Sequence, residues 1–222
     1  EGAIMRIARS GATVTAHADA GGTMATVLAD EHTFNRALEG TGAAVAAINS
    51  PTQRVLSGRV EAVEEATERA RELGARVFKL RVTGAYHTPY MIDAIRDFQA
   101  QVNSETLTTL RRRVISTVTG TTVEPDEDLG SLMTRQFCQT VRFVEAATEA
   151  ARDSDLLIEV GPGKMLSGLA AEFIAGTPAI PIRAGAASAY GLLEVAGAAY
   201  AAGAPVQVGR LFGTASPAGQ PG

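Results

Sequence analysis

The order of strand and helix patterns over residues 22–82 limits the possible folds of this chain more than any other feature of the sequence. The patterns follow one another as strand, helix, strand, strand, helix, strand. Four ranges read as strands (22–28, 43–48, 53–56 and 77–82) and two as helices (32–38 and 60–73). This is the order of a ferredoxin-like α+β unit, in which two helices cover one face of a four-stranded antiparallel sheet.

The helix expected over residues 60–73 has the clearest periodicity in the chain. Glutamate and arginine fill one face, Gly74 ends the helix, and the apolar positions Val60, Val63, Ala66, Ala70 and Leu73 share the other face. Between the two central strands, Asn-Ser-Pro-Thr at 49–52 has the chemistry of a turn. In the last strand, Phe78, Leu80 and Val82 alternate as in a strand.

After residue 83 the pattern becomes α/β. The continuous apolar run 156–160 is typical of a strand covered on both faces. Expected strands are 114–118, 156–160 and 179–182, and expected helices are 89–102, 132–137, 141–152, 164–175 and 189–202, with a polar loop at 120–130. At the other end of the chain, a helix is expected over residues 2–14 and a loop over 15–22. The tail after Gly213 is rich in proline, glycine, serine and alanine, and we expect a disordered linker there.

Composition excludes several classes of function. The chain has 20 basic and 24 acidic residues, a net charge of −4, so nucleic acid is not an expected partner. Cys138 is the only cysteine, which excludes a disulfide framework and a cysteine-based zinc site and fits a reducing, cytoplasmic compartment. No stretch approaches the roughly 20 apolar residues of a membrane span.

Three histidines are candidates for chemistry. His17 lies in a glycine- and alanine-rich loop and His32 at a helix start, so both are expected to be solvated or capping residues. His87 follows a strand and a turn of small residues and precedes Thr88-Pro89 and a helix. Functional side chains of α/β proteins are often presented at such junctions, although the residues alone leave a structural role for His87 open.

The segment around His87 resembles that of a known enzyme family. Residues 83–91 (Thr-Gly-Ala-Tyr-His-Thr-Pro-Tyr-Met) are similar to the His-Ser-Pro-x-Met region of malonyl-CoA:acyl-carrier-protein transacylases and synthase acyltransferase domains. The segment 193–212 resembles the end of acyltransferase domains in iterative enediyne or polyunsaturated-fatty-acid synthases. Four further segments resemble family elements in the family's order: 47–58, 114–120, 135–143 and 157–168.

The resemblance implies an α/β fold in which a partial α/β-hydrolase-like acyltransferase subdomain carries an inserted ferredoxin-like α+β subdomain. Residues 1–21 would then be the last residues of the N-terminal part of the large subdomain, and residues 83–212 its C-terminal part. Between them, residues 22–82 would form the ferredoxin-like small subdomain, and residues 213–222 would be a linker.

The resemblance also implies a reaction. A malonyl group would move from malonyl-CoA, through a serine ester, to the phosphopantetheine thiol of an acyl carrier protein, with no bound cofactor and no metal. Ketosynthase and other domains of a parent synthase are the further expected partners, and neither nucleic acid nor membrane is expected.

The resemblance carries three positions over, and three further residues are candidates for substrate binding. His87 matches the catalytic base, and Gln136 matches the residue whose backbone carbonyl fixes the histidine tautomer. Arg9 aligns with the arginine that binds the malonyl carboxylate bidentately, although Arg9-Ser-Gly-Ala is a poor copy of the family's Arg-Gly-x-x-Met. Tyr86 is bulky and favours malonyl over methylmalonyl. Gly84 matches neither the residue typical of malonyl-selective domains nor the one typical of methylmalonyl-selective domains. Asn49 is a further substrate-binding residue.

The family's nucleophile is absent from the sequence. It sits in Gly-His-Ser-x-Gly, and no Gly-x-Ser-x-Gly occurs in this chain. We expect that motif to precede residue 1, the chain alone to be inactive, and a missing central strand to leave an exposed sheet edge. Two alternatives stay open, a catalytically inactive acyltransferase-like docking or scaffold domain, and an unrelated α/β hydrolase or binding protein.

Overall fold

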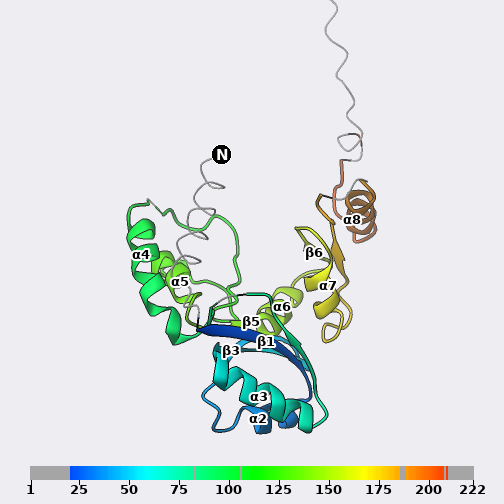
Figure 1. Ribbon diagram of the computed structural model, residues 1–222. Helices are drawn as coiled ribbons and strands as arrows, with labels where there is room; N and C mark the ends of the chain where they lie inside the picture. The colour runs from blue at the N-terminus through cyan, green and yellow to red at the C-terminus, as the bar shows by residue number, and fades with distance from the viewer. Residues whose placement is uncertain (1–20, 83, 106, 186–188, 208, 210–222) are drawn as a thin grey trace, which may run out of the picture. The chain divides into compact units, whose positions relative to one another are not determined.

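The computed structural model describes residues 21–82, 84–105, 107–185, 189–207 and 209. These residues form two compact units (Figure 1), the first reaching Glu149 and the second beginning at Ala150. Each unit is described by itself below. Within the described residues no helix combines the length and the apolar character that crossing a bilayer requires.

The first unit is built on a five-stranded mixed sheet with the strand order β4-β1-β3-β2-β5. Strand β1 pairs antiparallel with β3 and with β4, β2 pairs antiparallel with β3, and β5 runs parallel to β2. The elements of this part are β1 (Gly22–Leu28), α2 (Glu31–Leu38), β2 (Ala44–Ser50), β3 (Gln53–Arg59), α3 (Val60–Glu72), β4 (Arg76–Lys79) and β5 (Val141–Arg142).

Helices α2 and α3 cover one face of this sheet (Figure 1). Their apolar stripes pack on inward side chains of β1 and β3, and Phe34 and Leu56 are almost completely buried. Burying side chains of this size contributes about 1.5–3 kcal/mol each to folding, before the entropy of ordering them is subtracted. Asp30 begins α2 by accepting a hydrogen bond from the Thr33 backbone N–H, at 2.7 Å.

The opposite face of the sheet carries a second cluster. Met24, Ala46, Ala47 and Val55 are buried there, and the partly buried Leu80, Tyr86 and Val141 pack against them. Tyr86 belongs to the segment that follows β4, so the connection out of the sheet returns across this face.

Two further helices of the first unit pack on each other. A short 3₁₀ turn, η1 (Pro89–Met91), leads into α4 (Ile92–Asn103), which packs on α5 (Leu129–Arg135). The rings of Phe98 and Phe137 meet edge to face at 4.8 Å, an arrangement favoured by the ring quadrupoles.

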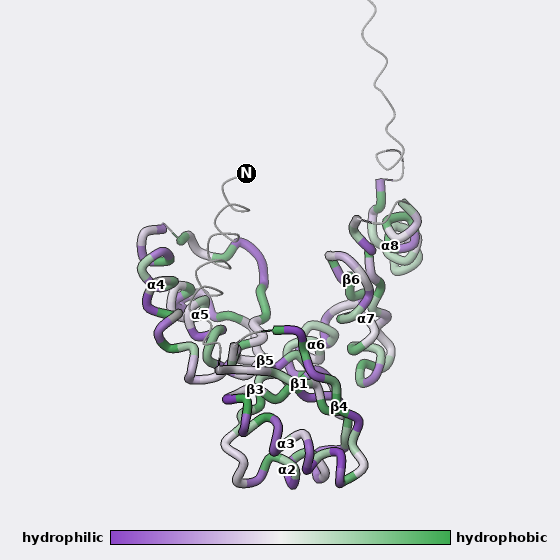
Figure 2. The backbone as a smooth tube through the Cα atoms, viewed as in Figure 1, coloured by the Kyte–Doolittle hydropathy of each residue, from purple (hydrophilic) through white to green (hydrophobic). Residues whose placement is uncertain are grey.

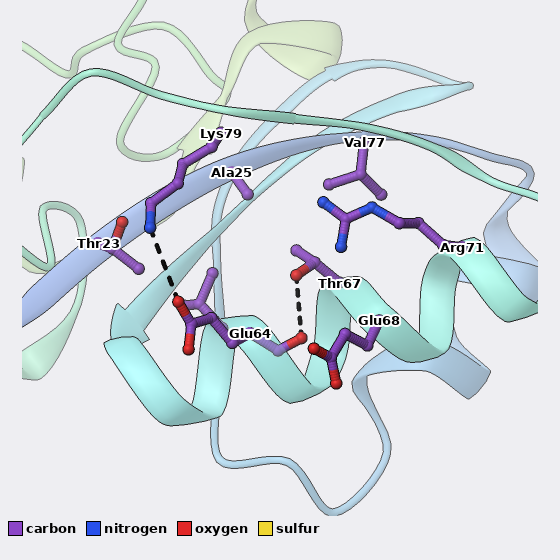
Figure 3. A pocket seen from close by; sticks show the side chains of 9 residues that line it. Thr23, Ala25, Glu64, Thr67, Glu68, Arg71, Val77 and Lys79 are labelled. Atoms are coloured by element: carbon purple, nitrogen blue, oxygen red, sulfur yellow. Dashed lines mark hydrogen bonds and ion pairs between the residues drawn. The ribbon is translucent and has the colours of Figure 1, made fainter.

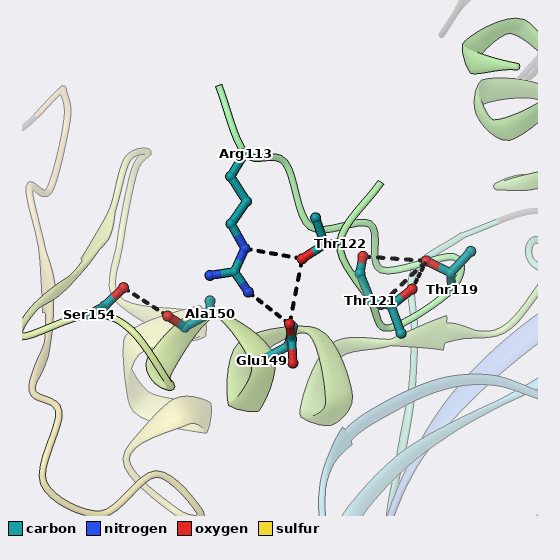
Figure 4. Close-up of polar contacts among 7 residues, drawn as sticks. All are labelled: Arg113, Thr119, Thr121, Thr122, Glu149, Ala150 and Ser154. Carbon is teal, nitrogen blue, oxygen red and sulfur yellow. Dashed lines mark hydrogen bonds and ion pairs between the residues drawn. The ribbon is translucent and has the colours of Figure 1, made fainter. Parts of the chain in front are cut away.

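A polar cluster fastens the loop between α4 and α5 to helix α6 (Phe143–Ala151), as Figure 4 shows. The Arg113 guanidinium donates to Thr122 Oγ1 at 3.0 Å and to Glu149 Oε1 at 2.7 Å. A single antiparallel bridge joins Ile115 to Thr122. The cluster therefore closes this loop against α6.

The second unit contains a two-stranded parallel sheet made of β6 (Leu157–Glu159) and β7 (Ala179–Pro181). Helix α7 (Met165–Ala170) contacts both strands, and α8 (Tyr190–Ala201) contacts β7. The sequence of α8 has a single charged residue, Glu194, and the helix is coloured mostly in green and pale tones in Figure 2.

Several sequence-based boundaries were wrong. Residues 114–118 form only the isolated bridge at Ile115 and not a strand, because the chain turns back at once, with the Gly120 N–H donating to the Ser116 carbonyl. Residues 141–142 belong to strand β5, and the expected helix 164–175 ends at Ala170. In β4 the side chain that reaches the core under the helices is Val77, whereas Phe78 is 49% exposed.

Candidate active site

The loop of residues 84–88, here called the histidine loop, crosses the start of β1. The Gly84 backbone N–H donates to the Gly22 carbonyl at 3.1 Å. Gly84 has φ 129°, a conformation that favours glycine, and both Gly84 and Ala85 are buried. A Cβ on Gly22 would lie 2.7 Å from the Gly84 carbonyl carbon, so only glycine lets the two backbones approach this closely.

His87 has a left-handed backbone, with φ 61°. This conformation is uncommon for residues other than glycine and costs about 1–3 kcal/mol, so the surrounding contacts must hold it. The His87 N–H donates to the Phe137 carbonyl at 2.9 Å. The completely buried Thr88 hydroxyl donates to the Ala85 carbonyl and accepts from the Tyr90 N–H, which closes the turn around His87.

The His87 ring meets the end of α5. Its Nδ1 lies 2.8 Å from the Gln136 carbonyl oxygen. The last carbonyls of a helix have no partner within the helix, and Gln136 is the C-cap residue of α5. Asp128 fixes the other end of α5 by accepting from the Ser131 N–H, so the position of this carbonyl follows from the helix.

This contact determines what the imidazole can do. A carbonyl oxygen only accepts hydrogen bonds, so Nδ1 carries the proton, and in the neutral ring Nε2 then keeps its lone pair. A neutral histidine in this tautomer can take a proton from a hydroxyl at Nε2. The carbonyl occupies the place that a carboxylate takes in a Ser-His-Asp triad and orients the ring in the same way.

Cys138, two residues after Gln136, is not a competing nucleophile. Burial raises the pKa of the Cys138 thiol, and the opposing contribution of the Met91 backbone is smaller. The thiol therefore stays protonated near neutral pH, whereas cysteine nucleophiles react as thiolates.

For the other predicted residues, the structure gives burial and packing rather than a hydrogen bond that defines their role. Tyr86 is half-buried and packs against two clusters, one on the sheet and one around Met91. Asn49 is half-buried on β2, the strand that pairs with β5. Arg9 lies outside the described residues. His87 and Gln136 are thus the two predicted residues that a direct hydrogen bond brings together.

Sequence reasoning missed two residues that hold the histidine loop. Thr88 and Gly22 were not singled out, although Thr-Pro is a usual start of a helical turn, with threonine as cap and proline in the first position. Gly22 has no sequence signal of its own, because its role comes from a chain crossing more than sixty residues away in sequence.

Replacing Gly22 by alanine should destabilise the first unit by about 1–3 kcal/mol, since the added methyl group forces the histidine loop away from β1. The measurement is the free energy of unfolding from urea denaturation. Gly197→Ala in α8 is the matched control, because nothing lies within 4 Å of a Cβ at that position and alanine favours a helix. Equal stability of Gly22→Ala and the parent chain would contradict the close approach.

A separate hollow of about 190 Å³ lies between α3 and the strands β1 and β4 (Figure 3). Lys79 and Glu64 form an ion pair of 3.7 Å at its edge, and Thr67 donates to the Glu64 carbonyl. None of the predicted site residues lines it. The described residues also contain no group of three histidine, cysteine, aspartate or glutamate side chains that could hold a metal ion.

In the second unit, Glu159 organises the turn that follows β6. Its carboxylate accepts hydrogen bonds from the Leu166 N–H at 3.1 Å, the Ser167 N–H at 2.9 Å and the Ser167 hydroxyl at 2.7 Å. Burial alone would raise the pKa of Glu159, but these hydrogen bonds outweigh it and hold the pKa below its ordinary value.

The lowered pKa of Glu159 predicts a pH-dependent contribution to stability. The ionised carboxylate stabilises the fold above the pKa of an unfolded glutamate, and this contribution is lost as the pH falls through the lower, folded pKa. Glu159→Gln should therefore destabilise the chain at pH 7 and much less at pH 3, measured by thermal unfolding. Glu68→Gln, on an exposed carboxylate of α3, is the control and should show no such difference. A constant effect of Glu159→Gln across this range would contradict the network.

Comparison with known proteins identifies the relatives. The model of the family described as "Acyl transferase domain" matches residues 1–171. Polyketide synthase GfsA of Streptomyces halstedii is 32% identical over 203 residues, which cover 84% of this chain and 3% of that protein. The malonyl CoA-acyl carrier protein transacylase of Staphylococcus aureus (strain MSSA476) is 35% identical over 125 residues, covering 55% of this chain and 40% of that protein.

Solved structures of acyltransferase domains are also similar to this chain. The acyltransferase domain of the iterative polyketide synthase in enediyne biosynthesis is 36% identical with a TM-score of 0.84, covering 92% of this chain and 54% of that domain. The acyltransferase domain from the second module of the salinomycin polyketide synthase is 26% identical with a TM-score of 0.81, covering 97% and 53%. The chain thus spans about half the length of the solved domains it matches.

Proposed function

The chain belongs to the acyl transferase domain family, and from this premise we propose that it supplies the catalytic base for the transfer of a malonyl group from CoA to an acyl carrier protein. The observation that supports this most directly is the 2.8 Å contact between His87 Nδ1 and the Gln136 carbonyl, which leaves Nε2 available.

The proposed reaction has two half-reactions that use the same base. His87 Nε2 takes the proton of a serine hydroxyl as its oxygen attacks the malonyl thioester carbonyl, and the proton then goes to the departing CoA sulfur. In the second half-reaction Nε2 takes the proton of the phosphopantetheine thiol, whose sulfur attacks the serine ester. The proton returns to the serine oxygen as that bond breaks.

The substrate-binding roles follow from the family. We propose that Arg9 binds the malonyl carboxylate through two charge-assisted hydrogen bonds and thereby selects dicarboxylic acyl groups. Tyr86 and Gly84 precede the base and limit the space for an α-methyl group, an effect worth about 1–3 kcal/mol in such pockets. Asn49 is proposed as a further polar residue on the substrate side.

The proposed organisation of the domain is that expected from the sequence. Residues 22–82 form a ferredoxin-like small subdomain, inserted between parts of a large α/β-hydrolase-like subdomain at 1–21 and 83–212, and 213–222 form a linker. The strand order β4-β1-β3-β2 and the two helices on one face support the first assignment. We propose a cytoplasmic location, and as partners an acyl carrier protein and a ketosynthase with further domains of a polyketide synthase.

The chain by itself should transfer no acyl group, because its sequence lacks a Gly-x-Ser-x-Gly nucleophile turn. Purified chain incubated with labelled malonyl-CoA should show no covalent acyl group by intact-mass spectrometry. It should also give no malonyl carrier protein above the enzyme-free control. Loading of any serine followed by transfer to the carrier protein would contradict the assignment of the nucleophile to other polypeptide.

A non-catalytic scaffold domain is the second candidate, supported by the absence of the nucleophile motif and the half-length match to solved domains. The retained His87–Gln136 contact argues for catalysis, since a docking role does not require it. An experiment that joins the chain to the serine-bearing part of a related domain distinguishes the two candidate functions. Only a catalytic domain is expected to transfer malonyl to the carrier protein in that joined protein.

A further inference from the structure

Two successive backbone carbonyls hold His87 in place. The Gln136 carbonyl accepts from the ring at Nδ1, at 2.8 Å, and the Phe137 carbonyl accepts from the His87 backbone N–H at 2.9 Å. Both carbonyls belong to residues 135–139, here called the α5 turn, which begins at the last residue of α5. Any movement of the α5 turn therefore acts on the ring and on the left-handed backbone of His87 together.

The α5 turn is folded back on Arg135. The Arg135 carbonyl accepts two hydrogen bonds, from the Cys138 N–H at 3.0 Å and from the Gln139 N–H at 3.1 Å. A further backbone hydrogen bond, from the Phe137 N–H to the Thr134 carbonyl, is longer at 3.4 Å. The placement of Arg135 therefore sets the placement of the carbonyls that meet His87.

The side chain of Arg135 ties the end of α5 to the segment before the helix. Its Nη2 donates to Glu127 Oε1 at 2.6 Å, in an ion pair whose side chains are 39% and 30% exposed. Glu127 directly precedes Asp128, the residue that caps the start of α5. Helix α5 has only seven residues, and a helix this short is not stable by itself, so contacts at its ends decide where its last carbonyls lie.

The guanidinium of Arg135 needs the carboxylate to stay where it is. Its Nε is buried and has no hydrogen-bond partner among the described residues, whereas its Nη2 meets Glu127. A buried donor without a partner disfavours this position of the side chain. The charge of Glu127 offsets that cost, so the ion pair rather than packing alone keeps the arginine at the end of α5.

We propose that the Glu127–Arg135 ion pair is a positioning contact for His87. It holds the α5 turn so that the Gln136 carbonyl stays within hydrogen-bonding distance of Nδ1, and the ring keeps the tautomer with a free Nε2. Partly exposed ion pairs contribute little to overall stability, so the pair should affect the histidine more than it affects the unfolding of the first unit. The consequence for the rate rests on the proposed function, whereas the effect on the tautomer does not.

The test removes the guanidinium and keeps an unbranched side chain. In Arg135→Met the ratio of the Nδ1–H to the Nε2–H tautomer of His87 should fall about three- to tenfold, within the range of coupling found inside one hydrogen-bond network. Two-bond ¹⁵N–¹H correlation spectra of the complete chain measure this ratio. Glu127→Ala should give the same fall and the double variant no further fall, because each change removes the same contact.

Glu65→Ala is the matched control. Glu65 forms an ion pair of the same length, 2.6 Å, with Arg69 on α3, and its loss should leave the tautomer of His87 unchanged. Arg135→Lys keeps the positive charge without the planar guanidinium and should recover part of the ratio.

The rate gives a second measurement in the chain joined to the serine-bearing part of a related domain. Arg135→Met and Glu127→Ala should each lower kcat about three- to tenfold, following the tautomer ratio. Both should leave KM for malonyl-CoA unchanged, because the ion pair has no proposed contact with the substrate.

An unchanged tautomer ratio in Arg135→Met and Glu127→Ala would overturn the proposal. A changed ratio that occurs only together with a loss of amide protection throughout the first unit would also overturn it, because the pair would then have a structural role. A changed ratio with an unchanged rate in the joined protein would support the positioning contact and contradict the role of His87 as base.

Discussion

Replacing His87 by glutamine should lower kcat/KM for malonyl transfer about 10²–10⁴-fold, the range that a positioned general base contributes. The protein for this experiment joins the chain to the serine-bearing part of the enediyne-synthase domain, so that nucleophile and base are both present. Glutamine keeps a polar side chain of similar size but cannot take the serine proton. The loss should fall mainly on kcat, because His87 has no proposed contact with the malonyl carboxylate.

His32→Gln is the control for this experiment. His32 is an exposed residue of α2, far in sequence from the histidine loop, and its replacement should leave the rate unchanged. A His87→Gln protein that transfers malonyl at more than about a tenth of the parent rate would remove His87 from the role of base.

Replacing Arg9 by alanine should reduce kcat/KM for malonyl-CoA about 10²–10³-fold, since in the proposed function it removes the charge-assisted bidentate partner of the malonyl carboxylate. The same change should leave acetyl-CoA turnover within a few-fold, because acetyl has no carboxylate. The ratio of the two kcat/KM values in the joined protein is the measurement. Arg6→Ala, on the other arginine of the expected helix 2–14, should leave this ratio unchanged.

Lysine at position 9 adds a further distinction. It keeps the positive charge but cannot form the fork of two parallel hydrogen bonds, so Arg9→Lys should recover only part of the malonyl preference. An unchanged preference for malonyl over acetyl in both variants would show that another residue binds the carboxylate.

Strands β1 to β4 and helices α2 and α3 could be predicted because each has a strong local pattern. The stripe of α3 is confirmed by the burial of Val63, Ala66 and Ala70. The error in β4 has a physical cause, since this edge strand has apolar residues at Val77, Phe78 and Leu80, so alternation alone does not decide which side faces the helices. Phe78 then lies against the Arg76 guanidinium, 5.6 Å from the ring centroid, outside the core.

Contacts between segments that are distant in sequence could not be predicted from the local hydrophobic pattern. Strand β5 has only two residues and forms because β2 offers an edge, with Ala47 paired to Val141. The Thr140 hydroxyl donates to the Val45 carbonyl at 2.7 Å and fixes this register. Hydrophobic periodicity contains no information about such a strand.

The candidate site was predicted in a different way. His87 stood out through its position after a strand, but its partner Gln136 came only from the family resemblance, because a backbone carbonyl leaves no mark on side-chain chemistry. The left-handed conformation of His87 and the hydrogen bonds of Thr88 that close its turn were visible only in three dimensions.

The central claim is that the Gln136 carbonyl holds His87 as a base with a free Nε2. Two-bond ¹⁵N–¹H correlation spectra of the isolated chain at pH 8.5 report the tautomer of each histidine ring directly. The predicted result for His87 is a protonated Nδ1 and an unprotonated Nε2. A ring protonated at Nε2, or one exchanging between tautomers as in a free imidazole, would contradict it.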